Sequence, residues 1–514
     1  MNKPEMNIKK FNIKKEWKIA MAATWLIGLL AHAYRFFNFL PIWDTMYNFD
    51  GTGATFTSGR WFLEYVGKIS TDYDMPWVNG ALSLFYLGCI VIMLIEVLEI
   101  KEHLWIILTA GLIVTFPSVT STFAYMFTAD GYMLAFLLAM LGVFLTEKYR
   151  FGFLAGMLSI CLSMSTYQAY LSASLLFVWL ICVKHLLIEE KSIWKLIQLE
   201  YKQGIAVAGG AVLNKVLTTV VNHFMGVSLV SYQGINDVHL LELEDCIKAI
   251  EKVQLWFRMF FQIGEQQKDN LYSGLNTGIF AVILLLTVVY VVKKKLYKKP
   301  LELVCLVIAY WCVPMLAYII RFVSMEVSYH TLMVMSLVMA YLLMVLFLAN
   351  LEKLHINGNI IKGIKGISMI VLCGICYYNI LNANYAYFNM NLSYEKAYAV
   401  SSDILERIEE LEGFDGTQPI AITGYYGKET EKFAKITPEI AGAANGNFLR
   451  DIDHYLAMWD YCMGREYKGA SVEQIEKLKE TAVYQQMGIY PYANAVQMID
   501  GVVMVKLPEI EEGN

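Results

Sequence analysis

The stretch WVNGALSLFYLGCIVIMLIEVL, residues 77–98, contains a single charged side chain, Glu96. About 20 consecutive apolar residues are enough for a helix to cross the hydrocarbon core of a bilayer. This stretch therefore predicts a transmembrane helix, and similar runs recur along most of the chain.

Composition places the whole chain in the same class. Hydrophobic residues make up 57% of the 514 residues, charged residues make up 17%, and the mean hydropathy is +0.46. These values are too apolar for an ordinary soluble protein. We expect a mainly α, polytopic membrane bundle of about eleven spans of bilayer-crossing length. They are expected at residues 18–37, 77–98, 104–120, 130–146, 151–165, 168–187, 204–225, 275–292, 301–320, 330–349 and 367–381.

The distribution of basic residues predicts the orientation in the membrane. Six lysines lie between Lys3 and Lys18, and the connections expected on the same side are also rich in lysine, most densely at 293–299. By the positive-inside rule, the N-terminus is cytoplasmic. An odd number of spans then places the first loop, residues 39–76, and the C-terminal segment outside. The first apolar stretch is span-length, so it predicts a transmembrane helix and not a cleaved signal peptide.

Two domains are expected. Residues 1–381 hold the spans, and residues 382–514 are poor in apolar runs and acidic, which predicts a small extracytoplasmic α/β domain. Within it we expect a helix at 393–411, a strand at 419–424, and a helix opening at Ser471, where Ser471 and Gln474 match a capping box. Asp500-Gly501 between two apolar runs predicts a β-hairpin.

Three aspartates are candidate catalytic residues. Asp44 follows the first span, and a carboxylate there could act as a general base toward an acceptor hydroxyl; the alternative is a solvated loop residue. Asp50 could assist, although Asp50-Gly51-Thr52-Gly53 also matches a plain turn. Asp130 opens the fourth span, where capping the helix is the simpler interpretation. Asp44 and Asp130 are both expected on the outer side, where they could share a divalent metal or divide acid and base roles.

Cationic and aromatic side chains near the membrane surface are candidate substrate contacts. Arg60 could bind a lipid phosphate, and Trp61 could stack on a sugar; both could equally be interfacial anchors. For Arg258 and Arg321 the anchor interpretation is favoured. Lys215 lies well inside a span and should face a polar cavity or a partner such as a phosphate.

A polar turn between the fifth and sixth spans supplies further candidates. Tyr167, Gln168 and Tyr170 could hold sugar hydroxyls, although tyrosines at this depth are commonly part of the aromatic belt. His330 could complete a polar outer site or simply belong to a loop. Most of the cysteines lie in apolar spans, without the spacing of a metal site. Cys246 and Cys462 are expected outside, and free thiols are favoured over a disulfide.

In order and spacing, these motifs resemble the bacterial type II O-antigen glucosyltransferases, within the GT-C superfamily of polyprenyl-phosphate-sugar-dependent enzymes. The matching segments are Asp44, Ser58-Gly59-Arg60-Trp61, Asp130-Gly131-Tyr132, Tyr167-Gln168-Ala169-Tyr170 and the closing strand 502–507. The family often has a second acid directly after the aspartate, but this chain has Thr45 there. A paired-carboxylate role would therefore need Asp50 or Asp130.

The resemblance implies a multi-pass bacterial plasma-membrane enzyme. It would move a hexose, glucose in this family, from a polyprenyl-phosphate carrier to a surface glycan at the outer face, with Asp44 as the base. The expected partners are that lipid-linked donor, the glycan acceptor and the bilayer, with no nucleic acid. No cofactor is indicated, and metal dependence stays open. The alternatives are a flippase or transporter of a lipid-linked sugar, and a glycan polymerase or ligase.

Overall fold

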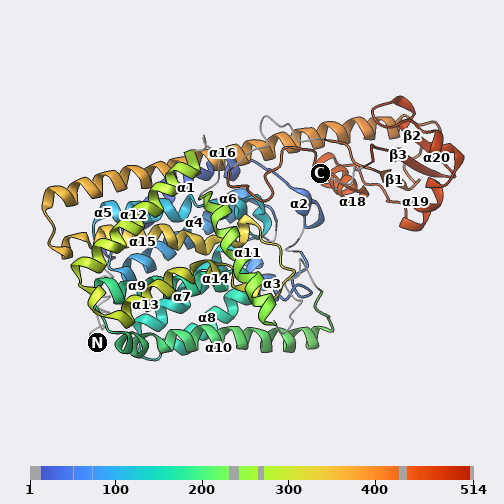
Figure 1. Ribbon diagram of the computed structural model, residues 1–514. Coiled ribbons are helices and arrows are strands. Elements are labelled where there is room, and N and C mark those ends of the chain that lie inside the picture. The colour runs from blue at the N-terminus through green and yellow to red at the C-terminus, as the bar shows by residue number, and fades with distance from the viewer. Residues whose placement is uncertain are drawn as a thin grey trace, which may run out of the picture.

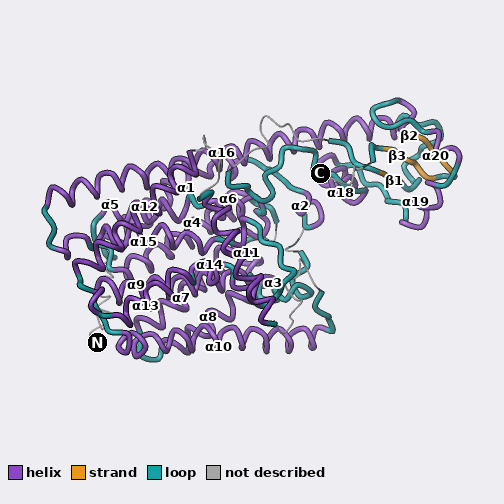
Figure 2. Tube along the Cα trace, in the orientation of Figure 1, coloured by secondary structure: helices purple, strands orange, loops and turns teal. Residues whose placement is uncertain are grey.

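The computed structural model describes residues 13–49, 51, 53–71, 73–230, 242–263, 271–427 and 437–509. Over these residues the chain forms a helical bundle, with a small α/β unit carried at the end of the longest helix, α16 (Figure 1). The strands are confined to that unit in the described part of the chain (Figure 2). The mainly α architecture predicted from the sequence is confirmed.

One side of the bundle is a row of five helices in which each packs against the next. In spatial order they are α1 (Lys15–Phe37), α4 (Pro76–Leu98), α7 (Met126–Lys148), α8 (Gly152–Thr166) and α10 (Ile193–Met225). A Cβ added to Gly156 on α8 would lie 2.6 Å from the Gly142 carbonyl oxygen on α7. Small residues permit such close helix contacts inside membranes, so these two glycines fix the α7–α8 approach.

The centre of the bundle is built around α15 (Val338–Ala349), whose side chains are all buried from Val338 to Leu348. It contacts α5 (His103–Val114), α9 (Leu171–Val183) and α12 (Leu271–Lys293). α6 (Pro117–Ala124) continues from α5 after a bend of 42°. Pro117 opens α6, and proline cannot donate the backbone hydrogen bond that an unbroken helix would need there. The remaining bundle helices are α11 (Leu243–Phe261), α13 (Pro300–Trp311) and α14 (Val313–Ala317).

The spans expected from the sequence can be compared with the apolar helices of the structure. Among the described residues, seven helices are long and apolar enough to cross a membrane, and counting the bent α5–α6 pair as one span gives eight. Three further apolar helices, at 152–166, 300–311 and 335–349, are shorter. Each of the expected runs coincides with one of these helices. Apolar sequence therefore located these helices, and the eight together with the three shorter ones correspond to the eleven expected runs, so the number of crossings stays a prediction.

α16 (Gly358–Glu409) extends from the bundle without a break, so the expected domain boundary at 381/382 falls within a helix. The apolar run ends there, but the sequence from Ile375 to Glu412 contains neither glycine nor proline to stop the helix. The expected separate helix at 393–411 is the last part of α16. The unit that follows, residues 410–509 as far as they are described, is called the cap below, and the adjoining end of the bundle is called the cap end.

The cap holds a mixed three-stranded sheet of order β1-β3-β2 among the described residues. β1 (Ile420–Thr423) pairs parallel with β3 (Val502–Lys506), and β2 (Val496–Ile499) pairs antiparallel with β3. Asp500 and Gly501 form the turn with φ of 49° and 78°, which confirms the predicted hairpin. The cap helices are α18 (Ile452–Ala457), α19 (Val472–Lys479) and α20 (Ala482–Gln486), and the Ser471–Gln474 capping box is present at α19.

Candidate active site

A cavity of about 620 Å³ opens at the cap end, between the bundle and the cap. Its wall brings together segments that are far apart in the sequence. They include the first loop (Trp43, Asp44, Asn48, Thr55, Arg60), the start of α7 (Tyr125, Phe127, Tyr132), Tyr167, His330, and Glu439, Ala441 and Gly442 of the cap. Four residues that the sequence singled out, Asp44, Arg60, Tyr167 and His330, therefore face one space.

Asp44 is placed by a short helix, α2 (Trp43–Tyr47), that the cap holds from the other side. The guanidinium of Arg450 lies over the Trp43 ring at 4.8 Å. The Tyr47 hydroxyl donates to the carboxylate of Asp451, and its ring lies 4.2 Å from that of His454. At the start of α2, the hydroxyl of Thr45 accepts a hydrogen bond of 3.2 Å from the Ile42 N–H. Thr45, where the family often has an acid, thus has a structural role.

The carboxylate of Asp44 is half-buried and accepts no hydrogen bond from the side chains or backbone of the described residues. Burial raises its pKa above the ordinary aspartate value, and the nearby positive charge of Arg450 partly opposes that rise. A carboxylate with free lone pairs and a raised pKa is suited to accept a proton.

Arg60 is held against two tyrosines that also line the cavity. Its Nη1 donates to the Tyr132 hydroxyl at 3.1 Å, and its guanidinium lies 5.1 Å from the centre of the Tyr167 ring. The two tyrosine rings stack at 4.3 Å with an angle of 14° between them. This stack holds the cation at the cavity wall, where a planar guanidinium can bind a phosphate through two hydrogen bonds.

The model of the family described as glucosyl transferase GtrII matches residues 33–347, which is more than half of the chain. The chain belongs to this family. No curated protein and no solved structure matched it. A GtrII glucosyl transferase with these apolar helices is a membrane glycosyltransferase, and the cavity is its candidate active site.

The GtrII match includes the Asp44, Arg60, Tyr132, Tyr167 and His330 side of the cavity but ends before the cap. Glu439 was not identified by sequence reasoning. It reaches the cavity because the segment after Thr437 folds back onto the bundle. Thr331 donates to the Glu439 carbonyl, and Ser121 donates to the Ala441 carbonyl at 3.4 Å. Tyr132 also lines the cavity; it belongs to the Asp130-Gly131-Tyr132 segment that resembles the family, but it was not among the predicted substrate contacts.

Three predicted contacts do not line the cavity of this GtrII protein. Gln168 donates to the Ser58 carbonyl at 3.1 Å. Tyr170 is buried and stacks on Phe136 at 5.4 Å. Trp61 packs edge-on against Phe62 at 5.6 Å. Of the three, Gln168 holds the loop that carries Arg60, through its bond to Ser58.

The other predicted site residues lie away from the cavity or outside the described structure. Asp130 is buried in the second turn of α7 and is not part of the cavity wall, and Asp50 lies outside the described residues. No group of three metal-ligating side chains in the described chain includes Asp44 or Asp130.

Three of the basic residues predicted to contact substrate also lie outside the cavity wall. Lys215 lies on the exposed side of α10, next to the inward-facing Asn214. Its expected polar cavity is therefore not found among the described residues. Arg258 is exposed on α11. The guanidinium of Arg321 lies over the Trp256 ring, 5.6 Å from its centre.

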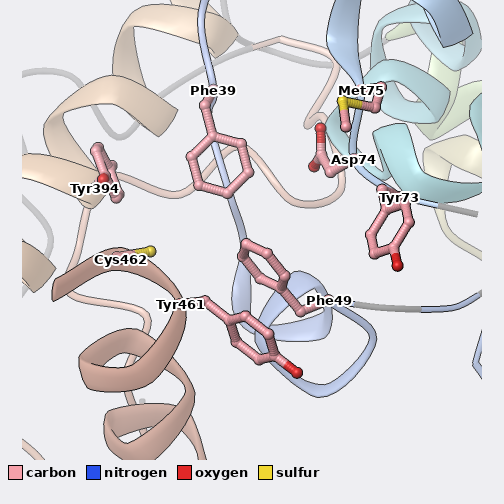
Figure 3. A pocket seen from close by; sticks show the side chains of 8 residues that line it. All are labelled: Phe39, Phe49, Tyr73, Asp74, Met75, Tyr394, Tyr461 and Cys462. Atoms are coloured by element: carbon pink, nitrogen blue, oxygen red, sulfur yellow. The ribbon is translucent and has the colours of Figure 1, made fainter. Parts of the chain in front are cut away.

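A second cavity of about 380 Å³ lies beside the first loop (Figure 3). Phe49 and Tyr461 stack face to face in it at 4.0 Å, which joins the first loop to the cap. Cys462 lines this cavity and, like Cys246, is a free thiol. The favoured absence of a disulfide between them thus agrees with the structure of this GtrII protein.

Proposed function

We propose that this GtrII protein transfers a hexose, glucose by its family, from a polyprenyl-phosphate carrier to a cell-surface glycan. The reaction takes place at the outer face of the bacterial plasma membrane. The lysine distribution supports an N-terminus in the cytoplasm. The first loop follows one helix, α1, and the cap contacts that loop through α2 and α18, which supports an outer location for both.

The observation that carries this proposal is the shared cavity of Asp44 and Arg60. Glycosyl transfer needs a base for the attacking hydroxyl and a cation for the departing phosphate, and these two side chains supply both chemistries. Tyr132 and Tyr167 pre-position the guanidinium, so little reorganisation is needed when charge develops.

The proposed step forms a bond from the acceptor oxygen to the anomeric carbon and breaks the bond from that carbon to the phosphate oxygen. The proton of the acceptor hydroxyl passes to Asp44, and the bonding electron pair leaves with the lipid phosphate, which Arg60 stabilises. Holding both substrates in one cavity makes the reaction effectively unimolecular.

The cap side of the cavity is proposed to receive the acceptor glycan. Glu439 is exposed there and can hydrogen-bond sugar hydroxyls or assist Asp44. His330, on the bundle side, is a further polar contact. The donor lipid is proposed to enter from the bilayer, with Arg60 binding its phosphate in the cavity.

The test is transfer by the purified full-length protein in proteoliposomes. The donor is polyprenyl-phosphate carrying labelled glucose, and the acceptor is surface polysaccharide. Asp44→Asn should abolish transfer, whereas Asp453→Asn, which alters an exposed acid of α18 outside the cavity, should retain it. Wild-type transfer by Asp44→Asn would remove the proposed base.

The same assay separates the competing functions. A flippase would move the labelled donor across the membrane without forming product. A polymerase or ligase would use an oligosaccharide on lipid pyrophosphate instead of a single sugar on lipid phosphate. Mass analysis of surface polysaccharide with and without the protein would then identify the hexose added.

A further inference from the structure

Far from the candidate active site, the bundle contains a second cluster of reactive side chains. Glu147 lies at the end of α7, His185 lies in the π-helical turn Lys184–Ile188 that follows α9, and Glu200 lies in the first turns of α10. α7 begins at the cavity, so Glu147 is about 30 Å away along the helix. The cluster thus lies at the end of the bundle opposite the cap (Figure 1).

The donor atoms of these three residues converge on one point. One imidazole nitrogen and one oxygen from each carboxylate all lie within 4.8 Å of one another. Nε2 of His185 is 3.1 Å from Glu200 Oε1 and 3.7 Å from Glu147 Oε1. Donor atoms bound to one Zn²⁺ at about 2.0–2.2 Å would have separations of this size.

Three buried side-chain atoms of the cluster have no hydrogen-bond partner among the described residues. His185 and Glu200 are 7% and 8% exposed, yet His185 Nε2 and both carboxylate oxygens of Glu200 form no hydrogen bond. The 3.1 Å contact between them therefore brings the atoms together without hydrogen-bond geometry. Leaving such groups unsatisfied is costly, and a bound cation would satisfy all of them.

The other ring nitrogen of His185 is already oriented. Nδ1 lies 2.9 Å from Glu189 Oε2, in hydrogen-bond contact. Metal-binding histidines commonly donate this second N–H to a carboxylate, which fixes the neutral tautomer and leaves Nε2 free for the ion. The π-helical turn brings His185 and Glu189 into this arrangement, and such turns are frequent at functional sites.

The charge balance also favours a divalent cation. The ion-pair contacts that connect to His185 involve four carboxylates and two lysines, namely Glu99, Glu147, Glu189, Glu200, Lys184 and Lys191. Glu99 and Glu189 pair with Lys184 and Lys191, so with a neutral imidazole the carboxylates of Glu147 and Glu200 keep two negative charges, which one divalent cation would balance. Burying uncompensated charge is strongly unfavourable.

We propose that Glu147, His185 and Glu200 bind a divalent metal ion that joins α7, the π-helical turn after α9, and α10. One imidazole and two carboxylates suit Zn²⁺ better than Mg²⁺, which prefers oxygen ligands alone. The ion has a structural role, because the cluster lies at the far end of the bundle from the cavity. This proposal does not depend on the transfer reaction.

The experiment uses the full-length protein in detergent, stripped with a chelator and then titrated with Zn²⁺ or Mg²⁺. Wild type should bind about one equivalent of zinc per chain and melt at a higher temperature with zinc than without it. Glu200→Gln should lose both effects. Glu99→Gln is the matched control, since Glu99 contacts Lys184 at 2.9 Å but is not a ligand, and it should retain both.

A further variant keeps the test decisive if Glu200→Gln does not fold. His185→Cys should still bind zinc, because a thiolate is also a zinc ligand, whereas it cannot replace an imidazolium in an ion-paired cluster. The proposal is overturned if wild type binds no zinc. It is equally overturned if zinc binding is the same in wild type and Glu200→Gln.

Discussion

The guanidinium of Arg35 and the carboxylate of Asp74 form a buried ion pair, in which Nη2 lies 3.0 Å from both carboxylate oxygens. Arg35 lies in the last turn of α1, and Asp74 precedes α4, so the pair joins the two ends of the first loop. The remaining donors of Arg35 bind the carbonyls of Phe123 at 2.9 Å and Asn38 at 3.0 Å. The first loop, which carries Asp44 and Arg60, is therefore anchored at its base.

Removing one member of this pair should destabilise the protein. Asp74→Ala leaves the fully buried Arg35 without its counter-ion, which typically costs about 3–5 kcal/mol. We expect a clear fall in the melting temperature of the detergent-solubilised protein. Combining Asp74→Ala with Arg35→Met should recover part of the loss, because no charge is then left unpaired. An unchanged melting temperature in the single variant would contradict the structural role.

The charge of Arg450 should set the pH dependence of transfer. The Asp44 base acts when deprotonated, so transfer should fall as the pH falls through its raised pKa. Arg450→Met removes the positive charge that lowers this pKa, and the acid limb of kcat/KM should move to higher pH. Arg465→Met is the control, because Arg465 of the cap pairs with Glu409, the last residue of α16, at 3.1 Å and does not line the cavity. If the acid limb does not move in Arg450→Met, the group whose titration limits transfer is not Asp44.

The fold was predictable to the extent that apolar runs mark helices. The run at 77–98 corresponds to α4, Pro76–Leu98, and the polar hairpin signal at Asp500-Gly501 corresponds to the β2–β3 turn. Hydropathy reports the surroundings of a helix and not its length. The expected boundary at 381 marks the end of the apolar run and lies within α16, and apolar runs alone did not show which helices are shorter than 18 residues.

The site was predictable where its residues share one loop. Asp44 and Arg60 both lie between α1 and α4, so their common location followed from the sequence. Glu439 joins them only through tertiary folding of the segment after Thr437, for which no local pattern exists. For Lys215, its depth within a span could be predicted but the face of the helix could not, and α10 turns Asn214 inward instead.

The Tyr132 hydroxyl should contribute to donor binding by holding Arg60. Tyr132→Phe removes the hydrogen bond to the guanidinium, and bonds to charged groups contribute about 1.5–3 kcal/mol, so kcat/KM for the donor should fall about tenfold or more. Tyr170→Phe is the matched control, because Tyr170 lies outside the cavity wall and stacks on Phe136. Equal losses in the two variants would mean that the effect reflects general packing.

The cap segment at Gly442 should control the shape of the cavity. Gly442 has φ of 85°, and an added Cβ would lie 2.9 Å from Ala124 Cβ and 3.3 Å from the Tyr125 ring. Gly442→Ala should therefore push this segment away from the bundle. A displacement of about 1 Å at a reacting site can reduce the rate by up to about 100-fold.

Gly413→Ala is the matched control, since Gly413 has φ of 83° but no atom within 4 Å of an added Cβ. Both variants place alanine in a left-handed conformation, at a similar backbone cost of about 1–2 kcal/mol. Only Gly442→Ala adds the contact with α6, so transfer should fall in that variant at comparable melting temperatures. If the two variants transfer sugar equally well, the cap segment does not shape the active site.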